Sequence, residues 1–470
     1  MNKSRIICTI GPSCDTKEKL IELVKNGMNS ARLNMSHGTI ESHQKNISLI
    51  KKIREELGVS LPIIIDTKGP EMRIKTFEND GVFLENGQSF SLTTREINGN
   101  EKEVSLAYKP LIEKINIGNL IFANNGMLSL EVEQITKTDI ICKVLSGGKL
   151  TNNKGLNVPG VVPSGPYLSE KDKNDLSLAI KNEVEFIAAS FISNNENVLE
   201  LRKFLKENGG EKISIISKIE NNSGVENIDS IILESDGVMI ARGDMGVELP
   251  AEKLPAIQKN IIRKCNKHGK IVIVATEMLE SMTENLRPTR AEVSDVANAI
   301  YDEATSVMLS GETAVGKHPE MVVDMMKKII KETEENISYS KRFATRETMF
   351  PNFTNAISNS VVNTAQILNA KLIIAFTNSG ETVNQIAKLK CPIPILGITA
   401  HESTFQKLGL SWGTTPIKGK VIQTEIEMIE FSKQKSIESG YAKSGDTIVI
   451  ASGILGVTSG LTNSLKALVI

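Results

Sequence analysis

The sequence is poor in aromatic residues, and its few cysteines are dispersed. Aromatic side chains make up 4% of the 470 residues, and Trp412 is the single tryptophan. The stacking platforms of single-strand nucleic-acid binders are therefore not expected. None of the five cysteines belongs to a CxxC pair, so neither a zinc site nor a disulfide framework is indicated. We expect small core residues or free thiols at Cys8, Cys14, Cys142, Cys265 and Cys391.

The chain also lacks an excess of either charge and any long apolar run. Lys and Arg total 55 against 56 Asp and Glu, which leaves a net charge of -1 and does not favour a nucleic-acid partner. No apolar stretch reaches the roughly 18 residues of a membrane span. The N-terminus enters a strand-like pattern without the apolar core of a signal peptide. These absences predict a cytoplasmic protein that binds neither nucleic acid nor membranes.

What the sequence does contain is a repeated alternation of strand and helix. From about residue 4 to 335, short β-rich runs alternate with amphipathic stretches of helical period. Eight such units predict a closed (β/α)8 TIM barrel rather than an open sheet. The strand candidates are 5–10, 30–35, 63–67, 186–190, 213–219, 238–241, 271–275 and 306–309, and the main helix candidates are 17–26, 40–57, 198–207, 257–267, 291–301 and 321–334.

Two further regions differ from this alternation. Between about Pro70 and Pro163, turn signals such as Glu85-Asn-Gly87 separate short alternating strands, which predicts an inserted β-barrel domain. The insertion leaves and rejoins the barrel near one rim, so it can act as a lid that excludes water. A small α/β domain is expected after about residue 345. The predicted boundaries are 1–69 and 164–340 for the barrel (domain A), 70–163 for the lid (domain B) and 345–470 for the C-terminal domain (domain C).

Lys218, Glu220 and Asp244 form the most informative motif. Lys218 and Glu220 are two residues apart on a predicted strand and so face the same way. Asp244 follows the end of the next strand. Such charges usually form a solvated face, but the isoleucines before Lys218 are too apolar for an edge strand, and ligands of α/β folds lie at strand C-termini. Two carboxylates and an ammonium at one rim suit a divalent cation and phosphate or enolate chemistry.

Other strand ends carry polar groups of the same kind. Arg32, Asn34 and Ser36 share one face by the period of two, with a guanidinium for phosphate and oxygens for a cation. Asp66 and Thr67 end the third strand, and Thr276 ends the seventh. For each, a polar strand end in water or a simple cap remains the alternative.

Two glycine-containing turns precede predicted helices. The amides at Gly243 and Asp244 could bind a carboxylate or phosphate, and the alternative is an ordinary glycine turn. In the C-terminal domain the segment from Thr377 to Thr382 lies between a strand and a helix. That segment is either a phosphate cradle or a common strand-to-helix turn.

Seven segments, in order, resemble those of the pyruvate kinase family over essentially the whole chain. They are ARLNMSHG, IDTKGPEMR, SKIEN, ARGDMGVELP, VATEMLESM, RPTRAEVSDVANAI and MLSGETAVG. The resemblance implies transfer of the phosphoryl group of phosphoenolpyruvate to ADP, giving pyruvate and ATP in the last step of glycolysis. It also implies a TIM barrel with a β lid, a C-terminal α/β regulatory domain, allosteric control and a homotetramer.

The resemblance implies a role for each rim residue. Lys218 matches the lysine that bridges the phosphoryl group and stabilises the enolate, and Arg32 matches the arginine that contacts the transferring phosphate. Thr276 matches the threonine beside the methylene carbon that receives a proton. Glu220 and Asp244 match the ligands of Mg²⁺ (or Mn²⁺). The remaining matches are Gly243 and Asp244 for the substrate carboxylate, Asn34, Ser36, Asp66 and Thr67 for K⁺, Asn34, His37, Arg73 and Lys154 for the nucleotide, Glu71 as typical of K⁺-dependent members, and Thr377, Asn378, Ser379, Gly380 and Thr382 for a phosphorylated effector.

The chain departs from the family pattern at a few positions. Asn124 and Asn125 replace an acidic pair of the lid, so a lid carboxylate at the metal-bound nucleotide is not expected. Glu381 adds negative charge beside the effector loop, which argues against activation by fructose 1,6-bisphosphate and leaves another phosphorylated effector or none. Two other functions remain open: a Mg²⁺-dependent lyase or aldolase of an enolate, against which the Arg32 cluster and the lid argue, and a non-catalytic metabolite sensor, which the two asparagines motivate.

Overall fold

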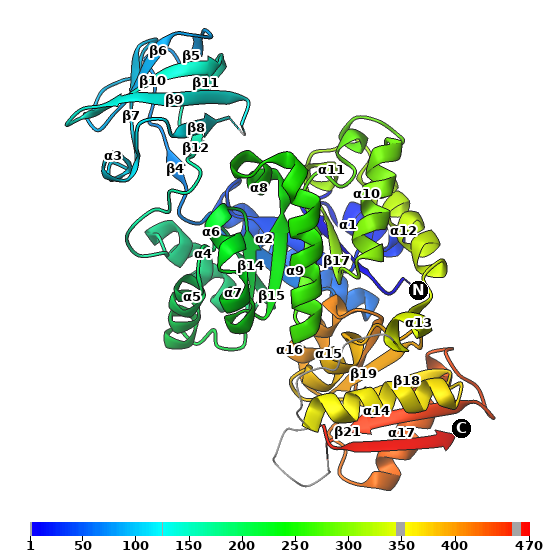
Figure 1. Cartoon of the computed structure of the whole chain (residues 1–470). Coiled ribbons are helices and arrows are strands. Elements are labelled where there is room, and N and C mark those ends of the chain that lie inside the picture. The colour runs from blue at the N-terminus through cyan, green and yellow to red at the C-terminus, as the bar shows by residue number, and fades with distance from the viewer. Residues whose placement is uncertain (1, 125, 345–352, 454–461) are drawn as a thin grey trace.

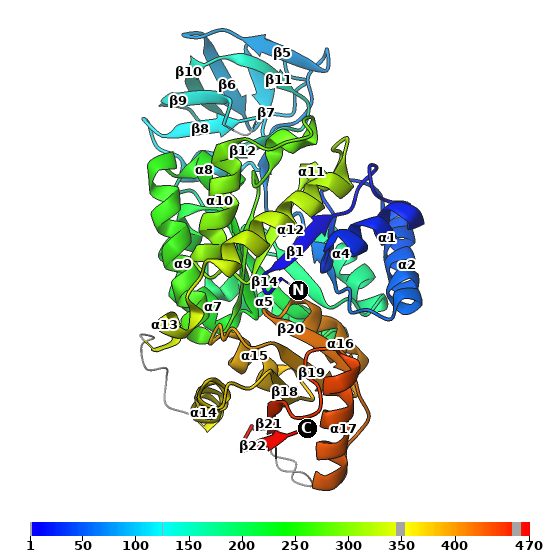
Figure 2. The same cartoon turned by 90° about the vertical axis from the view of Figure 1, so that its right-hand side faces the viewer.

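Three bodies follow one another along the molecule, with the lid at one end of the barrel and the C-terminal domain at the other (Figures 1 and 2). The structure is a computed structural model that describes residues 2–124, 126–344, 353–453 and 462–470. None of the helices in these ranges combines the length and apolar character needed to cross a membrane.

The central body is the predicted TIM barrel. Its eight parallel strands close in the order β1-β17-β16-β15-β14-β13-β3-β2. They are β1 (Arg5–Thr9), β2 (Ser30–Asn34), β3 (Ile63–Asp66), β13 (Phe186–Ala189), β14 (Ser214–Ile219), β15 (Gly237–Ala241), β16 (Ile271–Ala275) and β17 (Ser306–Leu309). The helices around them are α1 (Lys17–Asn26), α2 (Ile40–Leu57), α4 (Glu170–Lys181), α5 (Asn195–Glu207), α6 (Asn222–Glu226), α7 (Ile228–Glu234), α8 (Arg242–Glu248), α9 (Leu254–His268), α10 (Arg290–Tyr301), α11 (Gly311–Ala314) and α12 (Pro319–Glu335).

Burial on both faces explains why these strands are almost continuously apolar. Alternate side chains fill the barrel interior, among them Ile64, Ile216 and Met308, while their neighbours pack against the surrounding helices. Several helices begin at a hydroxyl that caps the first turn, as Thr39 caps α2 and Ser169 caps α4. The apolar strands thus carry the fold, and most of their polar groups lie at or near the strand ends.

The insertion is an all-β lid with a hydrophobic core of its own. A curled seven-stranded sheet runs in the order β4-β12-β8-β9-β10-β6-β7, and β11 pairs with β5 beside it. Phe90, Val104 and Ile140 are completely buried in its core. The elements are β4 (Met72–Arg73), β5 (Gly81–Leu84), β6 (Ser89–Thr93), β7 (Glu103–Ser105), α3 (Leu111–Lys114), β8 (Leu120–Ala123), β9 (Leu128–Ile135), β10 (Asp139–Ser146), β11 (Gly148–Thr151) and β12 (Gly155–Asn157).

The C-terminal domain is an α/β sheet in the order β20-β19-β18-β21-β22, parallel except for its last strand. Its elements are α14 (Phe353–Ile367), β18 (Leu372–Phe376), α15 (Glu381–Ala387), β19 (Ile395–Thr399), α16 (Glu402–Lys407), β20 (Thr414–Lys418), α17 (Glu425–Glu438), β21 (Thr447–Ser452) and β22 (Ser464–Val469), preceded by α13 (Tyr339–Ala344). Short 3-10 turns occupy Ala251–Lys253, Glu280–Thr283 and Leu408–Leu410.

Buried charges tie the barrel to this domain. Arg5 of β1 is 1% exposed and donates through Nε to the Ser411 carbonyl at 2.8 Å. Burial lowers the pKa of Arg5 to about 10, and the Glu334 carboxylate opposes that shift. The same Glu334 accepts the backbone N–H groups of Lys3 and Ser4 at 2.8 and 2.7 Å. The first barrel strand is therefore anchored to α12 and to the C-terminal domain at once.

Candidate active site

The predicted catalytic residues meet at the rim where the carboxyl ends of the barrel strands lie. Arg32 comes from β2, Asp66 from β3 and Lys218 from β14. Asp244 lies in α8, directly after β15, and Thr276 directly follows β16. The parallel order of the strands is what brings residues this far apart in the sequence to one end of the barrel.

Lys218 is the centre of a buried polar cluster. Its Nζ lies 3.0 Å from Oδ1 of Asp66, 3.0 Å from Oε1 of Glu220 and 2.7 Å from Oγ of Ser190. Burial by itself would lower the pKa of Lys218, but the Asp66 and Glu220 carboxylates more than offset it, so the pKa is raised. Lys218 therefore stays protonated and presents a fixed positive charge.

Asp66 holds a second cation on its other oxygen. Nε of Arg32 lies 2.7 Å from Oδ2 of Asp66, and Nη1 of Arg32 donates to Oγ1 of Thr9 at 2.9 Å. Burial would raise the pKa of Asp66, but Arg32 and Lys218 lower it. One carboxylate, 1% exposed, thus fixes the relative position of a guanidinium and an ammonium.

Glu220 and Asp244 are a pair of carboxylates suited to a hard divalent cation. Burial raises the pKa of Glu220; Lys218 opposes this shift, and repulsion from Asp244 and Asp66 adds to it. The Asp244 carboxylate accepts no hydrogen bond from any described residue. Two mutually repelling oxygen donors, one of them without a protein partner, fit a cation such as Mg²⁺, which commonly takes one or two carboxylates and keeps water or phosphate ligands. Within the described ranges no three His, Cys, Asp or Glu side chains cluster as a metal site.

Thr276 is held in a strained backbone conformation. Its φ is +68° and that of Glu277 is +53°, although a β-branched residue rarely adopts the left-handed region. Arg242 supports this turn by donating through Nη2 to the Thr276 carbonyl at 2.6 Å, while its Nη1 pairs with Asp295 at 2.6 Å. Oγ1 of Thr276 accepts the Gly243 N–H at 2.8 Å. The substrate-carboxylate and proton-transfer positions predicted from the sequence are thus directly connected.

The residues predicted to bind K⁺ and nucleotide surround the loop after β2. Oδ1 of Asn34 accepts the Ser36 N–H at 3.1 Å, an Asx turn that leaves the Ser36 and His37 side chains exposed. Thr67 is buried, and its Oγ1 accepts the Ser190 N–H at 3.3 Å. Both oxygens of Asp66 already face cations of the protein. Asn34 lies opposite Asp66 in the pairing of β2 and β3, so the oxygen donors are neighbours, with Asn34 and Ser36 at the accessible side.

Arg73 and Lys154 lie where the lid joins the barrel. Arg73 of β4 donates through Nε to Glu71 at 2.9 Å and through Nη1 to the Asn153 carbonyl at 2.6 Å. Lys154 accepts the Ile74 N–H on its carbonyl at 3.0 Å and leads into β12. These two predicted nucleotide contacts thus lie in, or directly before, the two strands through which the lid is attached.

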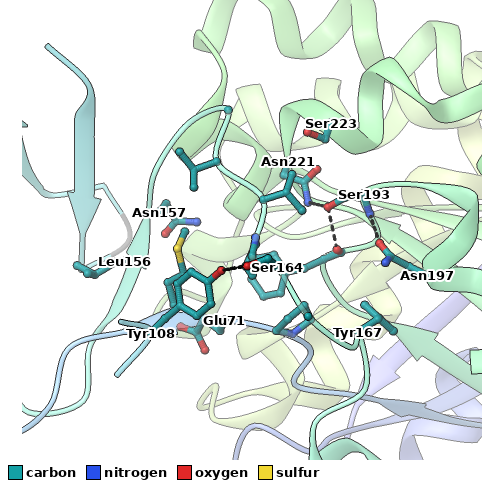
Figure 3. A pocket seen from close by; sticks show the side chains of 18 of the residues that line it. Glu71, Tyr108, Leu156, Asn157, Ser164, Tyr167, Ser193, Asn197, Asn221 and Ser223 are labelled. Atoms are coloured by element: carbon teal, nitrogen blue, oxygen red, sulfur yellow. Dashed lines mark hydrogen bonds between the residues drawn. The ribbon is translucent and has the colours of Figure 1, made fainter. Parts of the chain in front are cut away.

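A cavity of about 220 Å³ lies at this hinge (Figure 3). Its walls come from both connecting segments and from the loops after β13 and β14, where Asn221 donates to Ser193 at 3.1 Å. On the lid side Tyr108 and Ser164 share a hydrogen bond of 2.8 Å. The cavity borders the catalytic cluster because Phe191, one of its lining residues, donates its N–H to Glu220 at 2.6 Å.

Two other predicted features lie apart from this rim. The lid turn begins at Asn124, whose φ is +51°; Asn125 is outside the described residues. The effector-loop candidate lies between β18 and α15 in the C-terminal domain, at the opposite end of the barrel from the lid (Figure 1). There Gly380 has a φ of +96° and donates its N–H to Oγ1 of Thr377 at 2.8 Å.

Three residues of the site were missed in the sequence. Ser190 bonds Lys218 and also lies 3.2 Å from Asp66 through Oγ, and Tyr167 donates to the Ser190 carbonyl at 2.7 Å from a buried position. Arg242 supports Thr276 as described above. Ser190 follows the apolar run of β13 at the same rim, which is a signal that could have identified it. Tyr167 and Arg242 act through backbone carbonyls, which leave no sequence pattern.

Comparison with known proteins supplies the family. The family model for the barrel domain of pyruvate kinase matches residues 1–323, and the model for its alpha/beta domain matches residues 355–468. The chain belongs to the pyruvate kinase family. A pyruvate kinase of Clostridium acetobutylicum is 44% identical over the full length of both chains, and one of Clostridium perfringens is 44% identical over 99% of each. A crystal structure of a pyruvate kinase from Cryptosporidium parvum superposes with a TM-score of 0.94 at 37% identity, covering all of this chain and 96% of that one.

Family membership makes the chain a phosphotransferase with the architecture just described. The resemblance read from the sequence motifs is confirmed, and so is the division into TIM barrel, β lid and α/β domain. The lyase and the sensor are set aside as functions of this rim.

Proposed function

We propose that the rim around Lys218 transfers the phosphoryl group of phosphoenolpyruvate to ADP, giving pyruvate and ATP. One observation carries the assignment: Nζ of Lys218 lies within 3.0 Å of Asp66, Glu220 and Ser190. Arg32 is bound to the other oxygen of the same aspartate. Phosphoryl transfer needs charge neutralisation and alignment more than covalent help from the protein, and this cluster supplies fixed charges.

Each rim residue has a defined task in this reaction. Lys218 and Arg32 place positive charge on the phosphoryl oxygens, and Lys218 also stabilises the enolate oxygen as the phosphoryl group leaves. Thr276 lies at the methylene side of the enolate, where a proton is added to form pyruvate. The Gly243 and Asp244 amides bind the substrate carboxylate, and Gly243 is already aligned by its bond to Thr276.

Two kinds of cation complete the site. Glu220 and Asp244 would hold Mg²⁺ or Mn²⁺, and Asn34, Ser36, Asp66 and Thr67 would hold K⁺. When bound, these ions neutralise the phosphoryl oxygens that the protein cations leave uncompensated. The protein contributes oxygen donors that are buried or backed by buried groups, as Asp66 and Glu220 are.

The nucleotide enters between the β2 loop and the lid. Asn34, His37, Arg73 and Lys154 are its proposed contacts. Arg73 is already oriented by Glu71 and by the Asn153 carbonyl, so a phosphate group meets a guanidinium with a fixed plane. Because Arg73 belongs to β4 and Lys154 directly precedes β12, the two strands at which the lid joins the barrel, nucleotide binding and lid position would be linked.

We further infer the organisation of the chain beyond the active site. The units are 1–69 with 164–340, 70–163 and 345–470, assembled as a cytoplasmic homotetramer. Exposed apolar side chains on the C-terminal domain support association, since Ile426 is 76% and Val469 59% exposed. A phosphorylated effector would bind the loop formed by Thr377, Asn378, Ser379, Gly380 and Thr382.

A coupled assay tests the proposal directly. Pyruvate formation from phosphoenolpyruvate and ADP should require Mg²⁺ and be faster with K⁺. Asp244→Asn should lose activity by about 10²-fold or more, because an oxygen donor and a negative charge at the cation site are removed. Asp229→Asn is the matched control, since Asp229 is 73% exposed and pairs with Lys264 on the surface. Unchanged turnover in Asp244→Asn would refute the site.

A further inference from the structure

The loop after β2 is held by two side chains from the helices that surround the barrel strands. Nζ of Lys171, from α4, donates to the Met35 carbonyl at 2.8 Å. Nε2 of His43, from α2, lies 2.7 Å from the His37 carbonyl. A carbonyl only accepts, so this nitrogen carries the proton. The two bonds fix backbone oxygens on either side of Ser36, in the part of the loop that presents the proposed K⁺ and nucleotide contacts.

Lys171 has a second partner, and His43 is held by burial. Lys171 also pairs with Oδ2 of Asp175 at 3.0 Å, and the Asp175 side chain is 1% exposed. His43 is 8% exposed. Gly38 has a φ of +78°, and a Cβ added there would lie 3.2 Å from Nε2 of His43. The loop therefore lies close against the imidazole ring, and a side chain at Gly38 would be strained.

We propose that Lys171 and His43 are positioning residues that hold the β2–α2 loop ready for K⁺ and nucleotide. The proposal rests on the proposed function, because the K⁺ and nucleotide contacts of the loop are part of that function. Neither Lys171 nor His43 is assigned a contact with a substrate. Ser36 and His37 have exposed side chains. Asn34 holds their N–H groups at 3.1 and 3.3 Å, while Lys171 and His43 hold the carbonyls of Met35 and His37. Without the two bonds, the loop would have to be ordered at the moment of binding, and that ordering lowers affinity.

The loss of affinity should affect K⁺ and ADP and leave phosphoenolpyruvate unaffected. Lys218, Asp66 and Arg32 are held by each other within the barrel rim, so phosphoenolpyruvate binding does not depend on the loop carbonyls. The His43→Leu/Lys171→Met double variant should raise KM for ADP and the K⁺ concentration for half-maximal rate by roughly fivefold to tenfold. The kcat at saturating substrates and KM for phosphoenolpyruvate should stay within about twofold. The His43→Gln variant keeps a side-chain N–H donor. Its KM for ADP and its K⁺ requirement should therefore lie much closer to the wild-type values than those of His43→Leu.

Gln44→Leu provides the matched control. Gln44 and Asn182 exchange two side-chain hydrogen bonds of 2.8 Å between α2 and α4, so this change weakens the same helix pair without touching the loop. The Gln44→Leu variant should therefore keep the wild-type KM for ADP and the wild-type K⁺ concentration for half-maximal rate. If the buried His43→Leu change prevents folding, Lys171→Met alone decides, because the Lys171 side chain is 48% exposed.

The results separate this inference from the function on which it rests. A wild-type chain without K⁺-stimulated, ADP-dependent turnover would remove the proposed function. If the wild type is active and the folded variants keep its KM for ADP and its K⁺ requirement, the positioning role alone is overturned. The role would also be overturned if Gln44→Leu produced the same shift, or if KM for phosphoenolpyruvate rose equally.

Discussion

Asp66 and Lys218 form an ion pair across a barrel strand, with 3.0 Å between Oδ1 and Nζ. Asp66 belongs to β3 and Lys218 to β14, and β13 lies between these strands in the barrel. The gap is filled at the rim by Ser190, which follows β13 and accepts from Lys218 at 2.7 Å. Since Asp66 also binds Arg32, the spacing of the two cations is set by a residue that need not touch the transferred group.

The first prediction concerns that carboxylate. Asp66→Asn should lower kcat by about 10²-fold or more, because Lys218 and Arg32 lose the anion that aligns them. The neutral amide would also leave two buried cations undercompensated, so the melting temperature should fall. Turnover in the coupled assay and thermal unfolding measure the two effects. Asp229→Asn should change neither, and an Asp66→Asn enzyme with wild-type kcat would show that the alignment is unnecessary.

The second prediction concerns the strained turn at Thr276. Arg242→Lys keeps the charge but loses the planar fork that reaches both Asp295 and the Thr276 carbonyl. Thr276 should then relax from its φ of +68°, and kcat should fall by roughly 10-fold to 100-fold because a small misplacement at the reacting carbon is costly. Steady-state kinetics give kcat and KM for phosphoenolpyruvate.

Arg263→Lys controls for the change of residue type, since Arg263, among the residues that the structure describes, donates to Asn260 on the surface and to no other side chain. A wild-type kcat in Arg242→Lys would mean that Thr276 keeps its conformation without the guanidinium.

The third prediction concerns pH and Glu248 at the end of α8. Burial raises the pKa of Glu248 to about 7, the Asn222 N–H opposes the shift, and Asp244 adds to it. The folded chain therefore keeps a proton that the unfolded chain releases above its ordinary value of 4.5. With fewer protons bound in the unfolded state, stability contributed by this group falls as pH rises from about 4.5 to about 7 and then levels off.

Glu248→Gln removes this titration. In metal-free buffer the variant should melt at least ~2 °C above the wild type at pH 8, with the difference vanishing near pH 4. Thermal unfolding across that range is the measurement. Glu226 lies on the surface of α6, so the melting temperature of Glu226→Gln should follow that of the wild type at every pH. A constant offset between Glu248→Gln and the wild type would contradict the assigned titration.

The fold was largely predictable because each barrel strand is an apolar run bounded by an amphipathic helix. The expected strand 271–275 coincides with β16, and the expected helix 40–57 coincides with α2. In the C-terminal domain the sequence predicts strands at 372–376, 395–399, 447–451 and 465–470 but not β20, because Pro416 interrupts its pattern. Proline is tolerated there because β20 is the edge of its sheet, and edge position is a property of the folded sheet.

The charged residues of the site could be predicted and their supports could not. Lys218, Glu220 and Arg32 stand out as charges at the ends of apolar strands. Their spacing depends on Ser190, which meets Lys218 only when β13 and β14 pair in register. The positive φ of Thr276 goes against the local preference of a β-branched residue, so it follows from the contacts of Arg242 and from nothing in the local sequence.

The last prediction concerns the effector loop and Glu381. This residue begins α15, where its Oε1 accepts from Gln385 at 2.6 Å. Its charge should repel a sugar bisphosphate from the adjoining Thr377 to Gly380 turn, so fructose 1,6-bisphosphate should not activate the wild type. Glu381→Lys should replace repulsion by attraction and strengthen binding by roughly 10-fold at low ionic strength, an effect that salt weakens. Calorimetric titration with fructose 1,6-bisphosphate, glucose 6-phosphate and AMP measures the binding, and KM for phosphoenolpyruvate reports any activation.

Glu430→Lys on α17 is the matched control. The Glu430 side chain is 66% exposed, and the substitution makes the same charge change, so this variant should bind none of the three ligands more tightly than the wild type. Strong activation of the wild type by fructose 1,6-bisphosphate would show that the carboxylate at Glu381 does not exclude it.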